Sequence, residues 1–153
     1  MRRTEVTGCA DGVKATGSVE IYDSWLHGNA TNTVRSSGAS TQKLVFQRNA
    51  AYQDACTGNR HFRLASTQPQ AAPIIDLRIQ DNFFYGSGFI TIDRTTTVAS
   101  GTISGNTFAG TAARGPFTDP TYAGAGARRA SNVYESGEPA NDNLAAGYAC
   151  ATL

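Results

Sequence analysis

The sequence predicts an all-β fold, a right-handed parallel β-helix (a solenoid) of about five to six coils with an irregular C-terminal tail. The first observation behind this prediction is composition: the 153 residues are 40% hydrophobic and only 16% charged. Such a balance suits short strands and turns better than a helical bundle, which needs more Leu, Glu and Lys. The second observation is an internal repeat, which is the usual sequence signature of a solenoid.

Six segments share one pattern, in which an apolar residue stands between polar residues. The segments are 4–9, 19–24, 44–49, 77–82, 101–106 and 128–133. This alternation is typical of a half-buried strand. The residues expected to point inward are Val6, Ile21, Phe46, Ile79, Ile103 and Ala130. Their spacing fits a coil of about 22 to 27 residues with loops of varying length.

A second column lies three residues after each inward position and is mostly small or carries an amide. Its members are Cys9, Ser24, Asn49, Asn82, Asn106 and Val133. Asparagines stacked from coil to coil can satisfy the backbone groups of successive turns. Seven residues after the inward position glycine recurs, as Gly28, Gly86, Gly110 and Gly137. Glycine there permits the positive φ of a sharp turn.

Additional strands are expected at 12–15, 61–64 and 89–92, where they would form the other faces of each coil. Loops are expected at 28–41, 66–73 and 110–126, which are rich in turn-forming residues. The coils are expected to occupy residues 1–137. Residues 138–153 break the pattern and are expected to form a tail or cap.

The formal net charge of +1 argues against a global attraction to nucleic acid or to a membrane. No basic stripe is interleaved with aromatic residues, so a nucleic-acid partner is not expected. The chain has no apolar run of about 18 residues and no signal peptide, so it is expected to stay where it is made, to leave by assembly or lysis, or to be trimmed from a longer chain.

The three cysteines lack the spacing of a zinc site, and no metal is expected. Two interpretations of them remain open. Either all three are reduced, with Cys9 as a small core residue, or Cys56 and Cys150 form a disulfide.

Aromatic, amide and charged side chains near the outward columns suggest a surface for sugars, because a pyranose has an apolar face and a rim of hydroxyl groups. The candidate carbohydrate-binding residues are Tyr22, Trp25, Arg78 and Tyr85. The alternative interpretation is an ordinary solvated face that carries a few aromatic rings.

Asp23 and Asp81 occupy one column, with Arg48 between them, and these three residues are candidates for catalysis. Two coils of separation place the carboxylates roughly 9 to 10 Å apart. That distance is at the edge of the range of about 6.5 to 9.5 Å for an inverting glycosidase. The alternative is a surface Asp–Arg–Asp ladder without catalytic function.

Three segments, 19–25, 77–84 and 102–108, resemble coils of the pectate-lyase-like right-handed β-helix superfamily. The opening 5–14 is similar to coils of secreted actinobacterial β-helix repeat proteins and of phage pectin-lyase-like tail proteins. The resemblance implies the fold, but not one activity, because the superfamily contains lyases, hydrolases, tailspikes and adhesins. It implies calcium in the lyases, held by clustered Asp residues, and no such cluster is apparent here. It also implies a homotrimer.

We therefore expect a non-catalytic surface module that binds a polysaccharide, a cell-surface glycan or a protein partner, as virion tail components and adhesins do. Its expected location is extracellular or on the virion surface. Because the first strand begins close to Met1 without a visible cap, the first coil is expected to stack on another β-helix segment. A polysaccharide lyase or glycoside hydrolase acting on an extended acidic glycan, and a purely structural spacer, remain as alternatives.

Overall fold

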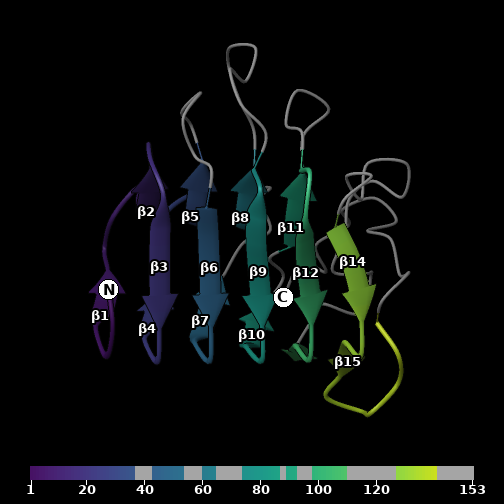
Figure 1. The fold of residues 1–153 in the computed structure, drawn as a ribbon. Coiled ribbons are helices and arrows are strands. Elements are labelled where there is room, and N and C mark those ends of the chain that lie inside the picture. Colours follow the sequence, from purple (N-terminus) through teal and green to yellow (C-terminus); the bar gives the residue numbers. More distant parts are fainter. Residues whose placement is uncertain are drawn as a thin grey trace.

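The computed structural model describes residues 1–36, 43–53, 60–64, 74–86, 89–92, 98–109 and 127–140. Within these residues every regular element is a β-strand, and all pairing between the strands is parallel. The prediction of an all-β fold is confirmed at this level. The strands form three sheets, of five, six and four strands (Figure 1).

Each sheet collects strands that are well separated along the chain. Sheet A contains β3 (Val19–Tyr22), β6 (Lys43–Gln47), β9 (Asp76–Gln80), β12 (Gly101–Ser104) and β14 (Ala127–Ala130). Sheet B contains β1 (Glu5–Thr7), β4 (Trp25–His27), β7 (Ala50–Gln53), β10 (Phe83–Gly86), β13 (Thr107–Ala109) and β15 (Val133–Tyr134). Sheet C contains β2 (Asp11–Ala15), β5 (Asn32–Ser36), β8 (Arg60–Leu64) and β11 (Phe89–Ile92).

From β1 to β13 the chain visits the sheets in the fixed order B, C, A, and every third strand is a hydrogen-bonded neighbour. We call one such passage a circuit. Successive circuits therefore lie side by side, as Figure 1 shows. The strands expected at 12–15, 61–64 and 89–92 are confirmed as β2, β8 and β11, and all three belong to sheet C.

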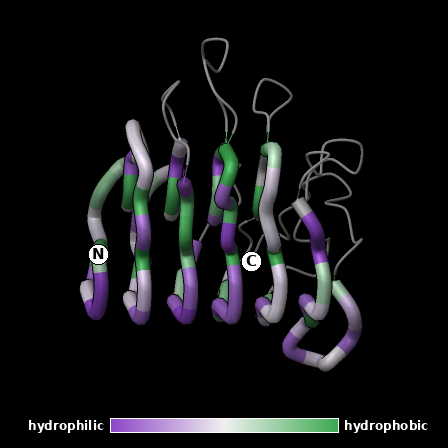
Figure 2. The backbone as a smooth tube through the Cα atoms, in the orientation of Figure 1, coloured by the Kyte–Doolittle hydropathy of each residue, from purple (hydrophilic) through white to green (hydrophobic). Residues whose placement is uncertain are grey.

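The core lies between the three sheets and is made by alternate residues of each strand. Sheet A contributes Ile21, Leu44, Phe46, Leu77, Ile79 and Ile103, sheet B contributes Leu26, Ala51, Phe84 and Phe108, and sheet C contributes Val34, Phe62, Leu64 and Ile90. All are essentially inaccessible to solvent. Phe84 is central, because its ring stacks on that of Phe46 (centroids 6.1 Å apart) and on that of Phe108 (5.2 Å). Along the tube in Figure 2, hydrophobic and hydrophilic positions alternate within the strands, as this packing requires.

A buried ladder of amides runs along the corner between sheets A and B. Its members are Asn49, Asn82, Asn106 and Asn132. In each step the amide oxygen of one asparagine accepts from the backbone N–H and the side-chain NH₂ of the asparagine one circuit earlier. For Asn49 and Asn82 these distances are 2.9 and 3.3 Å. The predicted column is thus confirmed at Asn49, Asn82 and Asn106, and the ladder satisfies backbone groups that the corner removes from the sheets.

The residue before Ser24 and the residue before each of the four ladder asparagines have a positive φ, which turns the chain from sheet A into sheet B. These residues are Asp23, Arg48, Asp81, Gly105 and Ser131, with φ between 52° and 64°. Asp, Asn and Gly accept this backbone conformation readily, whereas Arg does so at a cost. Gly28, Gly86 and Gly137 also have positive φ, as predicted, while Gly110 lies outside the described residues.

The predicted register of the first and last repeats is wrong. Val6 lies beside Leu26 in sheet B, not beside Ile21 in sheet A, because the sheet A position of the first circuit is taken by Arg2, which bridges Tyr22. At the other end Ile103 pairs with Arg129. The ladder residue there is consequently Asn132 and not Val133. In both cases the register follows the backbone and amide hydrogen bonds. It differs from the register that the apolar pattern of the sequence predicts.

Two further expectations are corrected. The loop expected over 28–41 contains strand β5, whose sequence NTVRS is too polar to show the apolar alternation of a strand. Cys9 is exposed and is not a core residue, while Cys56 and Cys150 lie outside the described residues.

The chain after β15 turns back, with an antiparallel bridge from Val133 to Pro139. The expected loops at 66–73 and 110–126 and most of the expected tail lie outside the described residues.

Candidate functional site

The outer face of sheet B carries a concentration of aromatic side chains, which we call the aromatic surface. Its members are Trp25, His27, Tyr52, Phe83 and Tyr85, from strands β4, β7 and β10. They face outward because they alternate with the buried residues of the same strands. The side chains of Trp25, Phe83 and Tyr85 are 38%, 42% and 46% exposed. Large apolar rings at this exposure, gathered on one face, usually indicate a binding surface.

The aromatic surface has two rows that run across the strands. In the first row Trp25, Ala50 and Phe83 lie in register on three adjacent strands. Neighbouring strands are about 4.8 Å apart, so Trp25 and Phe83 are separated by roughly 10 Å, with the small side chain of Ala50 between them. The first row therefore presents two large rings that are not in contact with each other.

In the second row the rings lie closer together. Tyr52 and Tyr85 are in register, and their rings stack with centroids 5.4 Å apart and an interplanar angle of 29°. His27 stacks on Trp25 of the first row at 4.8 Å and 21°. Its Nε2 atom is 2.7 Å from Oε1 of Glu5 on the neighbouring strand β1. These contacts hold the rings in fixed orientations, so a planar ligand would meet a preformed surface.

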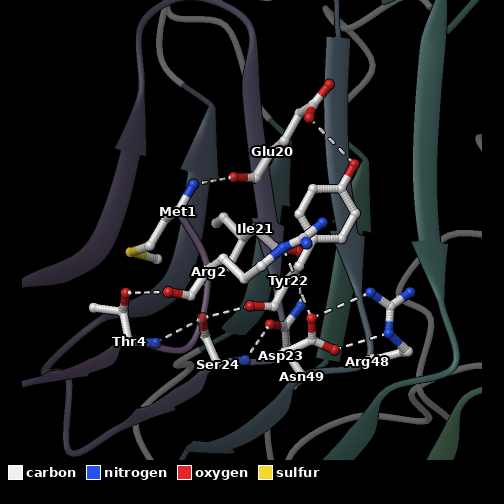
Figure 3. Close-up of polar contacts among 10 residues, drawn as sticks. All are labelled: Met1, Arg2, Thr4, Glu20, Ile21, Tyr22, Asp23, Ser24, Arg48 and Asn49. Carbon is white, nitrogen blue, oxygen red and sulfur yellow. Dashed lines mark hydrogen bonds and ion pairs between the residues drawn. The ribbon is translucent and has the colours of Figure 1, made fainter.

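Of the four predicted carbohydrate-binding residues, Trp25 and Tyr85 lie on the aromatic surface, and Tyr22 does not. Tyr22 ends strand β3, and two guanidinium groups lie over its ring. The Cζ atoms of Arg2 and Arg48 are 5.0 and 5.7 Å from the ring centroid. Figure 3 shows Tyr22 beside Arg2, with Asp23 facing Arg48. These cation–π contacts engage the ring of Tyr22, which is therefore less available to stack on a sugar.

Arg78, the fourth predicted residue, belongs to sheet A and therefore to another face of the molecule. Its side chain is exposed, and its Nε atom donates to Oδ1 of Asp76 at 2.7 Å. The predicted set is thus divided among two sheets and the corner between them. Trp25 and Tyr85 alone of this set are brought together.

The predicted catalytic residues Asp23, Arg48 and Asp81 do lie in one column, at the positive-φ corner positions of successive circuits. Asp23 and Arg48 form a bidentate pair, with Nε–Oδ1 and Nη2–Oδ2 distances of 2.8 and 3.2 Å. Arg2 adds a longer ion pair to Asp23 at 3.9 Å. The hydrogen bond from Arg48 holds the pKa of Asp23 below its usual value. A carboxylate kept ionised in this way is unsuited to act as a general acid.

Sequence reasoning missed His27, Tyr52 and Phe83. The repeat pattern indicated the strands of sheet A. It did not indicate that a strand of sheet B begins after only two corner residues, as β4 does after β3. Three aromatic residues follow one another in the sequence FFY at 83–85, so the sequence alone does not show which ring is buried. In the structure it is Phe84. Once the corner after Asn82 is known, the alternation from that residue assigns Phe83 and Tyr85 to the outside.

A second group of residues, on the outer face of sheet C, was also missed. Lys14, Arg35 and Arg63 lie in register on strands β2, β5 and β8. We call them the basic column. Asp11 lies 3.6 Å from Arg35, and within the described part of the chain Lys14 and Arg63 have no ion-pair partner. Like charges placed side by side on neighbouring strands are destabilising.

The described residues contain no group of three His, Cys, Asp or Glu side chains that could hold a metal ion. They therefore do not fit the clustered Asp ligands that the family resemblance implies for calcium. The same residues include no helix long and apolar enough to cross a membrane. Comparison of the chain with protein-family models, with curated proteins and with solved structures gives no match.

Proposed function

We propose that this chain is a right-handed parallel β-helix that binds carbohydrate on its aromatic surface without cleaving it. The three parallel sheets visited in a fixed order support the β-helix. Right-handedness follows the general rule for parallel crossovers, about 98% of which are right-handed. The observation that carries the binding function is the aromatic surface itself, with Trp25, Phe83 and Tyr85 more than a third exposed on one sheet.

Carbohydrate is favoured over other ligands because of the mixture of groups on this face. The rings offer apolar planes, while Glu5, His27 and the tyrosine hydroxyl groups offer hydrogen-bonding partners beside them. A non-catalytic role is supported by the engagement of Asp23 with Arg48, which leaves the most suggestive carboxylate ionised and paired. The proposed setting is a virion tail component or adhesin on an extracellular or virion surface. A homotrimer of such chains is part of this proposal.

A second candidate function is supported by the basic column. Three cations about one strand spacing apart would suit an extended acidic glycan, bound or cleaved on sheet C. A polysaccharide lyase or hydrolase of acidic glycans therefore remains the alternative. A purely structural spacer would need neither the aromatic surface nor the basic column.

The test is a glycan array probed with the purified chain, followed by an assay for new reducing ends on every glycan that binds. Binding without release, lost in the double variant Trp25→Ala/Tyr85→Ala and kept in Arg78→Ala, would support the proposal. Arg78 is a suitable control because it is an exposed residue on another sheet. New reducing ends would refute the non-catalytic function, and binding only to acidic glycans would favour the basic column.

A further inference from the structure

We infer that the aromatic surface takes an uncharged, extended and flat glycan whose chain lies across strands β4, β7 and β10. This inference rests on the proposed function and adds to it the class of glycan and the direction in which it binds. Two properties of the surface support it, the arrangement of the rings and the distribution of charge.

The arrangement of the rings sets the direction. Trp25 and Phe83 occupy equivalent positions two strands apart, roughly 10 Å from each other across the sheet. Tyr52 and Tyr85 continue the surface alongside them, stacked on neighbouring strands. The rings therefore follow the direction in which circuits stack, perpendicular to the strands. A ligand that contacts both Trp25 and Phe83 must run along this direction.

The flatness of the sheet limits the shape of the glycan. All the rings rise from outward positions of one parallel sheet, and Ala50 between Trp25 and Phe83 adds only a methyl group. An extended β-linked chain keeps its sugar faces near one plane and can lie over both rings. A helically curved α-linked chain leaves that plane within a few sugars. Several sugars are needed to reach from one ring to the other, so affinity should depend on chain length.

The charge on this face argues against an acidic ligand. Among the outward residues of β1, β4, β7 and β10, the acidic and basic side chains are Glu5 and His27, and these two contact each other at 2.7 Å. A carboxylate or sulfate on the ligand would meet Glu5 and no unpaired Lys or Arg. At the adjoining corner Arg48 is already bound to Asp23. Arg3 occupies the same corner near Asp23, and Lys14 and Arg63 of the basic column, which have no ion-pair partner among the described residues, lie on sheet C.

The test is isothermal titration of the full chain with three oligosaccharide series of increasing length. The series are β-1,4-linked glucose, α-1,4-linked glucose and β-1,4-linked mannuronate, each from the disaccharide to the hexasaccharide. We expect affinity for the β-glucan series to rise at least tenfold from the disaccharide to the hexasaccharide. The α-linked and mannuronate hexamers should bind at least tenfold more weakly than the β-glucan hexamer.

Variants link the binding to the two rings. Phe83→Ala should lower affinity for the β-glucan hexamer about tenfold, which corresponds to about 1.4 kcal/mol. The same variant should change affinity for the disaccharide much less, because a short ligand can occupy the Trp25 end alone. Arg78→Ala is the matched control and should leave both values unchanged. Circular dichroism of each variant checks that the strands are retained.

The outcomes separate this inference from the proposed function. Equal affinity for the α-linked or the mannuronate hexamer would overturn the inferred ligand class, while glycan binding as such would stand. No binding of any oligosaccharide, together with no binding on the array, would overturn both. Sedimentation analysis that shows self-association lost in Phe83→Ala would make the surface a contact between copies of the chain, and would likewise overturn the inference.

Discussion

Asn82 lies in the middle of the amide ladder, and replacing it with alanine removes four hydrogen bonds at once. Its Nδ2 atom donates to the carbonyl oxygen of Phe46 at 2.9 Å and to Oδ1 of Asn106 at 2.9 Å. Its Oδ1 atom accepts from the backbone N–H of Asn49 at 2.9 Å and from Nδ2 of the same residue at 3.3 Å. All four bonds are buried.

The magnitude follows from which of these groups lose a partner. Oδ1 of Asn106 still accepts from the backbone N–H of residue 82, and Nδ2 of Asn49 still donates to the carbonyl of Ile21. The N–H of Asn49 loses a bond that nothing replaces, whereas the carbonyl of Phe46 loses its side-chain donor but stays in the paired ladder of β6 and β9. A buried polar group without its partner costs about 1 to 3 kcal/mol and the lost bond to Phe46 adds about 0.5 to 1.5 kcal/mol, so the variant should lose about 1.5 to 4.5 kcal/mol of unfolding free energy. That is a large fraction of a typical total stability of about 5 to 15 kcal/mol.

The measurement is urea unfolding followed by circular dichroism, for the parent chain, Asn82→Ala and the control Ser24→Ala. Ser24 occupies the same column one circuit before Asn49, where its hydroxyl group accepts from the partly buried N–H of Thr4 and donates to the carbonyl of Tyr22. Its loss should therefore cost only about 1 kcal/mol. If Asn82→Ala were as mild as Ser24→Ala, the ladder would not be a main source of stability and the reasoning would be refuted.

Two further predictions concern a buried histidine and a corner glycine. His61 packs against Phe84 with ring centroids 4.8 Å apart, and burial lowers its pKa to about 3. In the unfolded chain the pKa of a histidine is about 6.5. His61 therefore leaves the free energy of unfolding unchanged above that pH and should reduce it by about 2 kcal/mol at pH 5. Between pH 7 and pH 5, the free energy of unfolding measured with urea should therefore fall less for His61→Leu than for the parent chain. An equal fall in both proteins would contradict this. Gly86 has φ of 95°, and a Cβ atom there would lie 2.1 Å from the carbonyl oxygen of Gln53. Gly86→Ala should therefore lower the melting temperature strongly, whereas Gly17→Ala, which meets nothing within 4 Å, should not.

The sequence was sufficient to predict the all-β class, the inward column from Ile21 to Ile103 and the Asn column, because these features repeat in every complete circuit. Prediction failed at the two ends of the repeat. There Val6 and Ala130 have the apolar character of the inward position. The actual register depends on the hydrogen bond from the N–H of Tyr22 to the carbonyl of Met1 and on the hydrogen bonds of Asn132 to the neighbouring circuit. Such bonds connect residues 20 or more positions apart, and a local pattern contains no information about them.

The candidate site was predictable only in part, for a related reason. Trp25 and Tyr85 were recognised as exposed aromatic residues. Their neighbours on the surface come from other circuits, and loops of different length separate those circuits along the chain. The same limit hid the basic column, because Lys14, Arg35 and Arg63 become neighbours only when the pairing of sheet C is known. Conversely, Tyr22 and Arg78 had the appropriate residue type, but the structure places them in contact with charged neighbours on other faces.

The division between inside and outside explains why the aromatic surface points to function. The core residues and the amide ladder account for the register of successive circuits, and both lie inside the three sheets. Outward positions of sheet B are therefore free to carry polar residues, as Thr107 does in the first row beside Phe83. Exposed rings at Trp25, Phe83 and Tyr85 are not needed to fill the core, and they raise the risk of aggregation. Their concentration on adjacent strands supports the proposed binding function.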